Sequence, residues 1–447
     1  MPLDEPVINV GILSDHQVNF ELYGDYNIQG FKQKFSGKFS AELKGDRIIC
    51  KNPNDKIEIS NEIIFEPGDS SVDSFLIRDV PIGKQFHWQR KQTQRFSGSL
   101  KFLKDGDNIW VINIVSISQY LKSVISSEMS AKSSLQLLKA HAIVSRSWLL
   151  AQIDKLKSSE GQNKENYLYK TDKEIIKWQD RGEHLLFDVC ADDHCQRYQG
   201  VSKISTENTN NAVEQTRGIV LMFGGKICDA RYSKSCGGIS ESFENVWEPV
   251  KHEYLSSVVD YKFEPENYNL DFSSEVNAKK WIMSNPTAFC NTNDERILSQ
   301  VLVDYDQETT DFYRWKVEYT QKEIAELINK KSGIDFGEIV DLVPVERGDS
   351  ARLIKVIIVG TTKEMLIGKE LEIRRILSPT HLYSSAFIVN KESDENGVPQ
   401  KFVIHGAGWG HGVGLCQIGA AVMASRGHQF DEILLHYFKK AKLKKIY

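Results

Sequence analysis

The sequence has no run of apolar residues near the ~20 that a membrane-spanning helix needs, so no transmembrane segment is expected. It also lacks an excess of basic side chains, since 56 lysines and arginines against 61 acids leave a net charge of -5. Proteins that bind nucleic acid over a broad face usually carry the opposite bias, so no nucleic-acid partner is expected. With 40% hydrophobic and 26% charged residues, the 447-residue chain has the composition of an ordinary globular protein.

Two further features are missing. The first residues, Met1 to Pro6, are acidic and show neither the basic segment nor the apolar segment of a secretory signal, so either the protein stays inside the cell or an export signal is absent from this sequence. Seven cysteines, an odd number in a chain of this length, do not form a disulfide framework. Five lysines between Lys439 and Lys445 are expected to form a solvated C-terminal tail.

The hydrophobic period changes along the chain. Residues 7 to about 112 show the short apolar runs and alternation of β-strands. A capping-box sequence at Ser116 then opens a predicted helix, and a second helix is expected from about Ser134 to Lys155. Residues 156–183 are polar and are expected to form a long loop or insertion, while another helix is predicted from about Gln417.

A carboxylate, Glu128, lies in the predicted connection between the first two helices. A lone glutamate in such a place is usually a solvated residue near a helix start. The functional alternative requires the acid to be withdrawn from water, so that it can donate a proton near neutral pH. Met129 and the apolar helix faces could supply the apolar wall that this alternative needs.

Four soft or borderline metal ligands occur within twelve residues: His184, Cys190, His194 and Cys195. Eleven histidines and seven cysteines spread evenly would place about half a residue there, so chance clustering is improbable. Two thiolates with two imidazoles would form a neutral, closed tetrahedral zinc site, which is typical of structural rather than catalytic zinc. The alternative is a pair of core cysteines with surface histidines.

Two later segments also stand out. Tyr232 and Lys234 would point to the same side of a strand that ends at Gly237-Gly238, although a plain hairpin with one snorkelling lysine has the same sequence pattern. Five glycines occupy nine positions from Gly406 to Gly414, around Trp409 and a histidine. Such a loop needs backbone conformations that only glycine adopts freely, or lies flat under a ligand, and its tryptophan suits stacking on a sugar.

Taken in chain order, these segments resemble the SpoIID/LytB family, named for stage II sporulation protein D and an amidase enhancer. The resemblance runs from about residue 96 to the C-terminus and is loose over much of 262–340. Its specific parts are Tyr120-Leu121 leading to Ser127-Glu128-Met129, Leu138 to Ala142 with Arg146, His194-Cys195-Gln196, Ser235-Cys236-Gly237-Gly238 up to Trp247, and Gly408 to Gly414 with Gln417 to Ala420.

The family's sporulation members are lytic transglycosylases that act on peptidoglycan strands stripped of their stem peptides. The resemblance therefore implies that Glu128 is the catalytic acid and that the four clustered ligands hold structural zinc. It also leads us to expect substrate contacts from seven side chains: Lys139, Arg146, Tyr232, Lys234, Trp409, His411 and Gln417. Cys236 and Cys416 stand where many relatives carry serine or another residue, which leaves a thiol role open.

The predicted function is thus cleavage of denuded glycan strands with formation of 1,6-anhydro-N-acetylmuramic acid. A non-enzymatic, glycan-binding amidase enhancer of the LytB type is the alternative, with a cell-wall amidase as partner. A thiol hydrolase using Cys416 with His405 or His411 is a weaker third possibility. Since peptidoglycan lies outside the membrane, we expect export to the cell envelope or periplasm.

For architecture, the resemblance and the sequence pattern together predict an α+β protein. We expect a β-rich region at 1–95, a catalytic segment with the zinc site at 96–260, an α+β lobe or insertion at 261–400, and a glycine-rich loop with a C-terminal helix at 401–447 that completes the core. A second lobe formed by the later strands is expected to meet the helical segment, with the cleft between them.

Overall fold

The computed structural model describes residues 5–54, 56–83, 89–158, 168–178, 184–203, 206–302, 309–393 and 397–447. Its strands and helices form a mixed α+β fold, which confirms the predicted fold class. The chain divides into two compact units, each described by itself below. Unit 1 comprises Met1–Leu156, Gly182–Val220 and Lys444–Tyr447, and unit 2 comprises Lys157–Arg181 and Leu221–Leu443.

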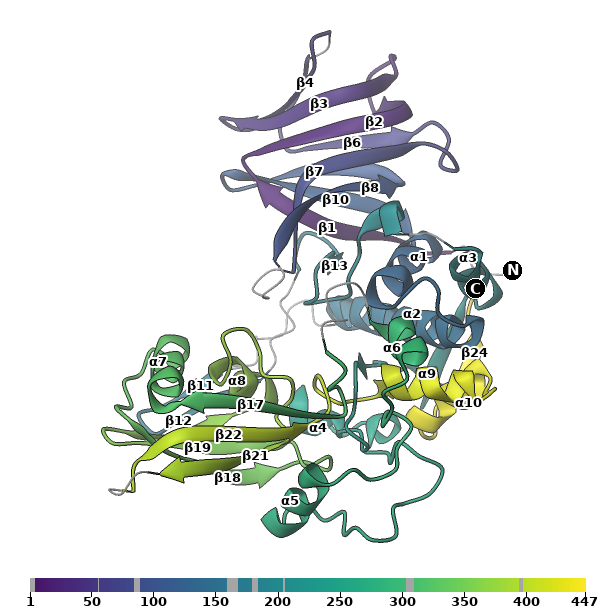
Figure 1. Ribbon diagram of the computed structural model, residues 1–447. Helices are drawn as coiled ribbons and strands as arrows, with labels where there is room; N and C mark the ends of the chain where they lie inside the picture. Colours follow the sequence, from purple (N-terminus) through teal and green to yellow (C-terminus); the bar gives the residue numbers. More distant parts are fainter. Residues whose placement is uncertain are drawn as a thin grey trace. The chain divides into compact units, whose positions relative to one another are not determined.

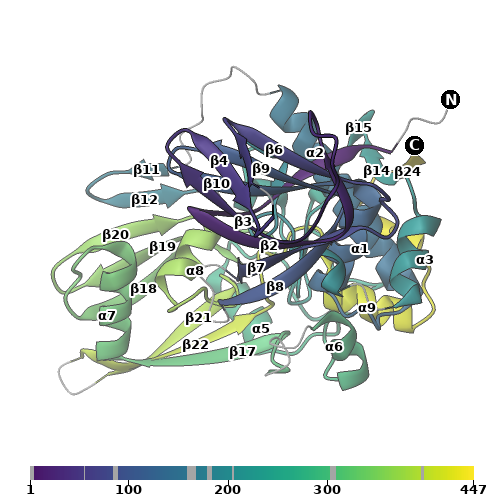
Figure 2. The ribbon, with the colours of Figure 1, turned by 90° about the horizontal axis from the view of Figure 1, so that it is seen from above.

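Unit 1 opens with one large antiparallel sheet (purple to blue strands, Figure 1; from above, Figure 2). Alternating side chains make one face of its strands apolar, and Phe20 contacts Phe39, Phe65 and Phe102 from three other strands. Burial of these rings stabilises the sheet. The strands are β1 Val7–Asp15, β2 Gln17–Ile28, β3 Phe35–Lys44, β4 Arg47–Lys51, β5 Lys56–Ile59, β6 Glu62–Pro67, β7 Ser74–Ile82, β8 Arg90–Ser97, β9 Ser99–Asp105 and β10 Asn108–Ser116.

The sheet leads directly into the helices of unit 1. The hydroxyl of Ser116 accepts a hydrogen bond from the Gln119 N–H at 3.3 Å, which confirms the predicted start of the first helix. Strand β13, Val189–Cys190, adds to the sheet in parallel with β1. The helical elements are α1 Ile117–Glu128, α2 Leu135–Ser158, η1 Gly200–Lys203 and α3 Glu207–Gln215. In the part of the chain that the structure describes, no helix is long and apolar enough to cross a membrane.

Unit 2 contains two principal sheets. The five-stranded sheet has the order β11-β12-β20-β19-β18, and the three-stranded sheet has the order β17-β22-β21. Residues 168–178, expected as loop, instead supply β11 and β12, because Ile175 adds a buried side chain to the core of this sheet. The strands are β11 Leu168–Lys170, β12 Glu174–Lys177, β17 Arg314–Thr320, β18 Ile339–Arg347, β19 Leu353–Gly360, β20 Glu364–Gly368, β21 Phe387–Ser393 and β22 Pro399–Ala407.

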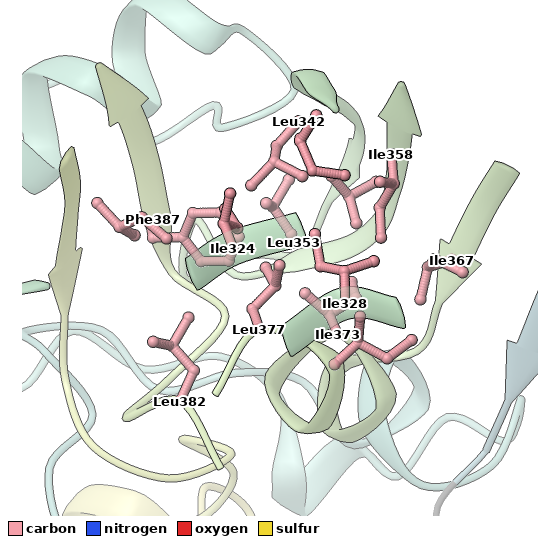
Figure 3. Close-up of a cluster of buried hydrophobic side chains, with 14 of the residues drawn as sticks. Ile324, Ile328, Leu342, Leu353, Ile358, Ile367, Ile373, Leu377, Leu382 and Phe387 are labelled. Carbon is pink, nitrogen blue, oxygen red and sulfur yellow. The ribbon is translucent and has the colours of Figure 1, made fainter. Parts of the chain in front are cut away.

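Two helices, α7 Gln321–Ser332 and α8 Glu370–Ile376, pack against these sheets. Ile324 and Ile328 of α7 and Ile373 of α8 lie beside Leu353 and Ile358 of β19 in a cluster of fully buried apolar side chains (Figure 3). This cluster gives unit 2 a core of its own, which fixes the strand β22 that leads into the glycine-rich loop.

The remaining elements of unit 2 surround that loop. They are β15 Lys226–Ile227, β16 Tyr232–Ser233, α4 Phe243–Val246, η2 Glu253–Leu255, α5 Glu275–Met283, α6 Glu295–Val301, β23 Leu415–Cys416, α9 Gln417–Ser425 and α10 Phe430–Tyr437. Helix α9 confirms the helix predicted from Gln417. Two boundaries between the units fall within strands, namely β14, Ile219–Phe223, and β24, Lys442–Lys445. Strand β24 also shows that the lysine-rich C-terminus is not the expected tail.

Candidate functional site

Glu128 is the last residue of α1 and is partly buried. The main-chain N–H of Arg197 donates a hydrogen bond to Glu128 Oε1 at 2.8 Å, which fixes the direction of the carboxylate. Met129, directly after it, is fully buried and begins the connection to α2. Glu128 thus lies at the C-terminal, negative end of the α1 dipole. A solvated glutamate near a helix start would instead lie at the positive end of a helix dipole.

A second carboxylate lies close to this acid. Asp193 Oδ1 accepts hydrogen bonds from Arg197 Nε at 2.9 Å and Nη2 at 2.6 Å, and both side chains are largely shielded from solvent. Burial raises the pKa of Asp193 to about 6; the Arg197 charge opposes this shift and the Glu128 charge adds to it. Arg197 therefore links two carboxylates, one through its backbone and one through its guanidinium.

The segment that carries Arg197 is anchored to α1 and to strand β10 by side-chain hydrogen bonds. Tyr120 donates to Gln196 Oε1 at 3.3 Å, and the Gln199 N–H donates to Ser123 Oγ at 3.1 Å. Tyr198 donates to Asn113 Oδ1 at 2.6 Å. Because these bonds are buried, they hold the main chain at 197 in register with the end of α1.

The four clustered ligands lie together immediately before this segment, and their donor atoms fall within 4.8 Å of one another. His184 Nε2 is 3.3 Å from Cys195 Sγ, and His194 Nδ1 is 3.5 Å from the same sulfur and 3.9 Å from Cys190 Sγ. Tetrahedral zinc with bonds of about 2.0–2.3 Å places its ligand atoms about 3.3–3.8 Å apart. Both the donor set and the spacing therefore fit a divalent metal of the zinc type.

Two other expected residues of unit 1 lie on α2. Arg146 has no exposed surface, and its Nη1 donates to the Ile219 carbonyl at 3.0 Å. Burial lowers the pKa of Arg146, while neighbouring Tyr447 and Glu5 act in the opposite direction. In this conformation the guanidinium holds the chain at Ile219 through this hydrogen bond, and the expected contact of Arg146 with substrate stays a prediction. Lys139 is partly buried.

In unit 2 the structure brings together the tyrosine-lysine strand and the glycine-rich loop. Strand β16 pairs in parallel with β23, so Tyr232 lies opposite Leu415. The Trp409 N–H donates to the Ser235 carbonyl at 2.8 Å, and the Ser235 N–H donates back to the Trp409 carbonyl at 3.1 Å. Two segments that are more than 170 residues apart in the sequence therefore form one surface.

The expected substrate-contacting side chains of unit 2 are held in place to different degrees. Lys234 donates to the Val301 carbonyl at 3.1 Å. Trp409 is partly buried, with one stacked contact to Tyr383 at 4.0 Å between ring centroids. Tyr232 and His411 are partly buried, and Gln417 is buried. Burial, followed by the charges of nearby arginines, holds the pKa of His411 well below its ordinary value, so its imidazole is neutral at neutral pH.

Two glycines of the loop, Gly408 and Gly412, lie against a residue that the sequence did not single out, Arg352. Its buried guanidinium donates to the Gly410 carbonyl at 3.1 Å, to the Cys236 carbonyl at 3.2 Å and to Ser350 Oγ at 2.8 Å. Four alternate glycines, Gly408, Gly410, Gly412 and Gly414, have φ between 75° and 92°, in the left-handed region. A Cβ at Gly412 would also overlap the Arg352 guanidinium, so glycine is required there on both counts.

Sequence reasoning missed Arg197, Asp193 and Arg352. A charged pair four residues apart, which flanks the metal ligands His194 and Cys195, was the available signal for Asp193 and Arg197. For Arg352 the only signal was a single cation at the start of an apolar strand. Glu128 belongs to unit 1, whereas Tyr232, Lys234 and Trp409 belong to unit 2. A cleft shared by these groups therefore stays a prediction.

The thiol alternative is not supported by the contacts of Cys416. This cysteine has no exposed surface, and its sulfur accepts a hydrogen bond from the Cys236 N–H at 3.3 Å. A nucleophile must reach its substrate and have a base within hydrogen-bond distance. Because Cys416 is fully buried, its sulfur cannot reach a substrate in this conformation.

Two families match parts of the chain. Residues 105–223 match the family described as "Stage II sporulation protein" (SpoIID), and residues 241–414 match "Domain of unknown function (DUF8618)". The first match contains Glu128 and all four clustered ligands.

Two relatives are similar over most of the chain. An uncharacterized protein of Brachyspira hyodysenteriae is 27% identical over 344 residues, which cover 77% of this chain and 70% of that protein. The amidase enhancer of Bacillus subtilis is 26% identical over 327 residues, which cover 71% of this chain but only 39% of that protein. The domain match at residues 105–223 and the amidase enhancer relative confirm the predicted resemblance to the SpoIID/LytB family.

Proposed function

We propose that this protein is a peptidoglycan lytic transglycosylase that cleaves denuded glycan strands, with Glu128 as both general acid and general base. The observation that carries the proposal is the setting of Glu128: a partly buried carboxylate at a helix end, directed by the Arg197 amide. A solvated surface glutamate has no need of a buried segment that orients it.

A single acid suffices for this reaction. Glu128 protonates the glycosidic oxygen that follows N-acetylmuramic acid, and the C6 hydroxyl of the same sugar attacks C1 to close the 1,6-anhydro ring. The ionised carboxylate then takes the proton of that hydroxyl. Hydrolysis would need a second carboxylate to act as nucleophile or to activate water. Here the attacking group is already part of the substrate, so holding the sugar in the right geometry lowers much of the barrier.

Zinc held by His184, Cys190, His194 and Cys195 has a structural role in this proposal. A closed tetrahedral site supplies a rigid cross-link and no open coordination position. Because Cys195 lies two residues before Arg197, that cross-link fixes the main chain that orients Glu128. Arg146 contributes in a similar way, by holding Ile219.

Unit 2 supplies groups suited to glycan binding. Trp409 presents a partly exposed ring, and Tyr232, Lys234 and His411 lie on the same paired segments. Aromatic rings stack on sugar faces, while the lysine and the neutral imidazole suit acetamido and hydroxyl oxygens. Lys139 and Gln417 complete the proposed binding set. With a substrate of this kind, the protein acts in the cell envelope or periplasm.

The second candidate function is that of a non-enzymatic amidase enhancer. It is favoured by the name of the Bacillus subtilis relative, although the match spans about two fifths of that protein's length. In this case the protein binds glycan and a cell-wall amidase, and Glu128 is dispensable.

Two incubations separate the functions: denuded glycan strands with the protein alone, and peptide-bearing peptidoglycan with a cell-wall amidase in the presence and absence of the protein. The transglycosylase proposal predicts 1,6-anhydro ends by mass spectrometry without any amidase. Release of wall material only when the amidase is present, with no anhydro ends, would favour the enhancer instead.

A further inference from the structure

Unit 2 contains a second group of metal-binding side chains that the proposed function does not use. Cys236, Asp260, Cys290 and Cys416 are all buried, and their donor atoms lie within 4.8 Å of one another. They come from four separate segments: the turn after β16, the loop after η2, the loop before α6 and the start of α9. The fold thus gathers three thiols and a carboxylate from positions up to 180 residues apart.

The sulfur geometry is that of a mononuclear tetrahedral site. Cys236 Sγ and Cys290 Sγ are 3.6 Å apart. Four ligands around zinc with Zn–S bonds of about 2.3 Å place neighbouring sulfurs about 3.8 Å apart. A disulfide would require about 2.05 Å between the same two atoms. The observed separation is therefore close to that of two thiolates sharing one ion.

Cys416 is placed as a thiolate ligand would be. It is the N-cap residue of the nine-residue helix α9, and its sulfur accepts a hydrogen bond from the Cys236 N–H at 3.3 Å. A helix start and a donated N–H both stabilise negative charge on sulfur.

Asp260 independently favours a cation in this cluster. It is 0% exposed, and its oxygens accept hydrogen bonds from the Tyr437 hydroxyl at 2.6 Å and the Cys290 N–H at 2.8 Å. Both partners are neutral, and a carboxylate buried away from water needs a compensating positive charge. Gly419 lets this carboxylate approach α9, since a Cβ there would collide with it.

The surroundings also balance the charge of a metal–thiolate centre. Three thiolates and one carboxylate leave a net negative charge around a divalent ion. Arg352 Nη1 donates to the Cys236 carbonyl at 3.2 Å, and Arg314 Nη1 donates to the next carbonyl, that of Gly237, at 3.0 Å. These guanidinium groups, buried in Arg352 and partly buried in Arg314, offset the charge without competing for the ligand atoms.

We propose that Cys236, Cys290, Cys416 and Asp260 form a second, structural zinc site, which cross-links the glycine-rich loop, helix α9 and the loop before α6. With four protein ligands the site is closed, so its ion stabilises the fold and leaves no position for substrate. This site is separate from the proposed zinc site in unit 1 and does not depend on the proposed reaction.

Metal content measured on protein purified without chelator tests the proposal. We expect two zinc ions per chain in the wild type and one in Cys290→Ser, while Cys228→Ser, a buried cysteine of unit 2 outside the cluster, retains both. Cys195→Ser, which removes the site of unit 1, is also expected to retain one. Zinc content of one in the wild type that falls to zero in Cys195→Ser overturns the proposal.

Cobalt(II) substitution provides a second readout that does not depend on Cys290→Ser being folded. The thiolate-to-cobalt charge-transfer band grows with the number of thiolate ligands. Cobalt bound to Cys195→Ser should therefore show a three-thiolate spectrum, and the additional change Asp260→Asn should weaken cobalt binding at least about tenfold, as loss of an anionic ligand does. An intact mass two hydrogens lower, with Cys236 and Cys290 joined in a disulfide, contradicts the metal site.

Discussion

The main-chain N–H of Arg197 and Glu128 Oε1 are joined by a hydrogen bond of 2.8 Å. Because this donor belongs to the main chain, a change of the Arg197 rotamer does not move it. The path of the backbone therefore sets the direction of the Glu128 carboxylate. That path is set on one side by the clustered ligands that end at Cys195 and on the other by the bond between Gln199 and Ser123. The proposed chemistry of Glu128 therefore depends on a segment that never needs to touch the substrate.

The first prediction concerns the metal ligands of unit 1. Cys195→Ser should remove one zinc ion and lower the rate of glycan cleavage about 10- to 100-fold, the usual cost of losing the groups that orient a site. The Arg197 amide should also exchange its hydrogen faster, because the segment that carries this amide is no longer held in register with Glu128. Zinc analysis, product release and hydrogen exchange measure the three effects.

The matched control is Cys50→Ser, since Cys50 is fully buried in the sheet of unit 1 and far from the cluster in sequence. The Cys50→Ser variant should bind as much zinc as the wild type and cleave glycan at the wild-type rate. Equal exchange of the Arg197 amide in Cys195→Ser and the wild type would show that the ligands do not position Glu128.

The second prediction concerns the glycine-rich loop. Gly412→Ala should lower the free energy of unfolding of unit 2 by about 2–5 kcal/mol, because it adds overlap with Arg352 to the strain of a left-handed backbone. Gly333→Ala is the control, since Gly333 also has a positive φ, 71°, but no atom lies within 4 Å of its added Cβ. It should cost only about 1–2 kcal/mol. Equal losses in denaturant titrations would mean that Arg352 does not constrain the loop.

The third prediction concerns acid stability. Burial, with the charges of Arg374, Lys331 and Arg375, lowers the pKa of His381 from 6.5 to about 4. The unfolded chain therefore binds a proton at higher pH than the folded chain, so this contribution to stability is complete above about pH 6.5 and is lost as the pH falls towards 4. In the variant His381→Gln, the free energy of unfolding should therefore fall less steeply as the pH is lowered, by at most about 1.4 kcal/mol per pH unit.

Urea unfolding between pH 4.5 and 7.5 measures this difference in slope. His16→Gln, at an exposed histidine of unit 1, should leave the pH dependence as it is in the wild type. Parallel curves for the wild type and His381→Gln would show that His381 is not the group responsible.

Local sequence signals predicted the elements that depend on neighbours in the chain. The Ser116 cap needed only the residues of one helix turn, and the density of ligands from His184 to Cys195 revealed the cluster without its geometry. The alternate glycines around Trp409 likewise implied a special backbone, which the positive φ angles confirm.

Long-range contacts were beyond such reasoning. Nothing near Arg352 in the sequence shows that it lies under a loop some sixty residues later, and no spacing rule joins Cys236 to Cys290. The polar sequence around β11 and β12 predicts a loop, yet β12 pairs with β20 of the sheet and β11 pairs with β12. These features depend on contacts between segments far apart in the sequence, which a local sequence pattern cannot predict.

The central claim is that Glu128 carries the proton in glycan cleavage, and the rate at which 1,6-anhydro ends appear from denuded strands tests it most directly. Glu128→Gln should lower this rate about 100- to 10,000-fold, the usual contribution of a general acid. Glu207→Gln, the same change at an exposed position of unit 1, should keep the wild-type rate, and both variants should unfold at the wild-type temperature. A folded Glu128→Gln variant that releases anhydro ends as fast as the wild type would contradict the claim.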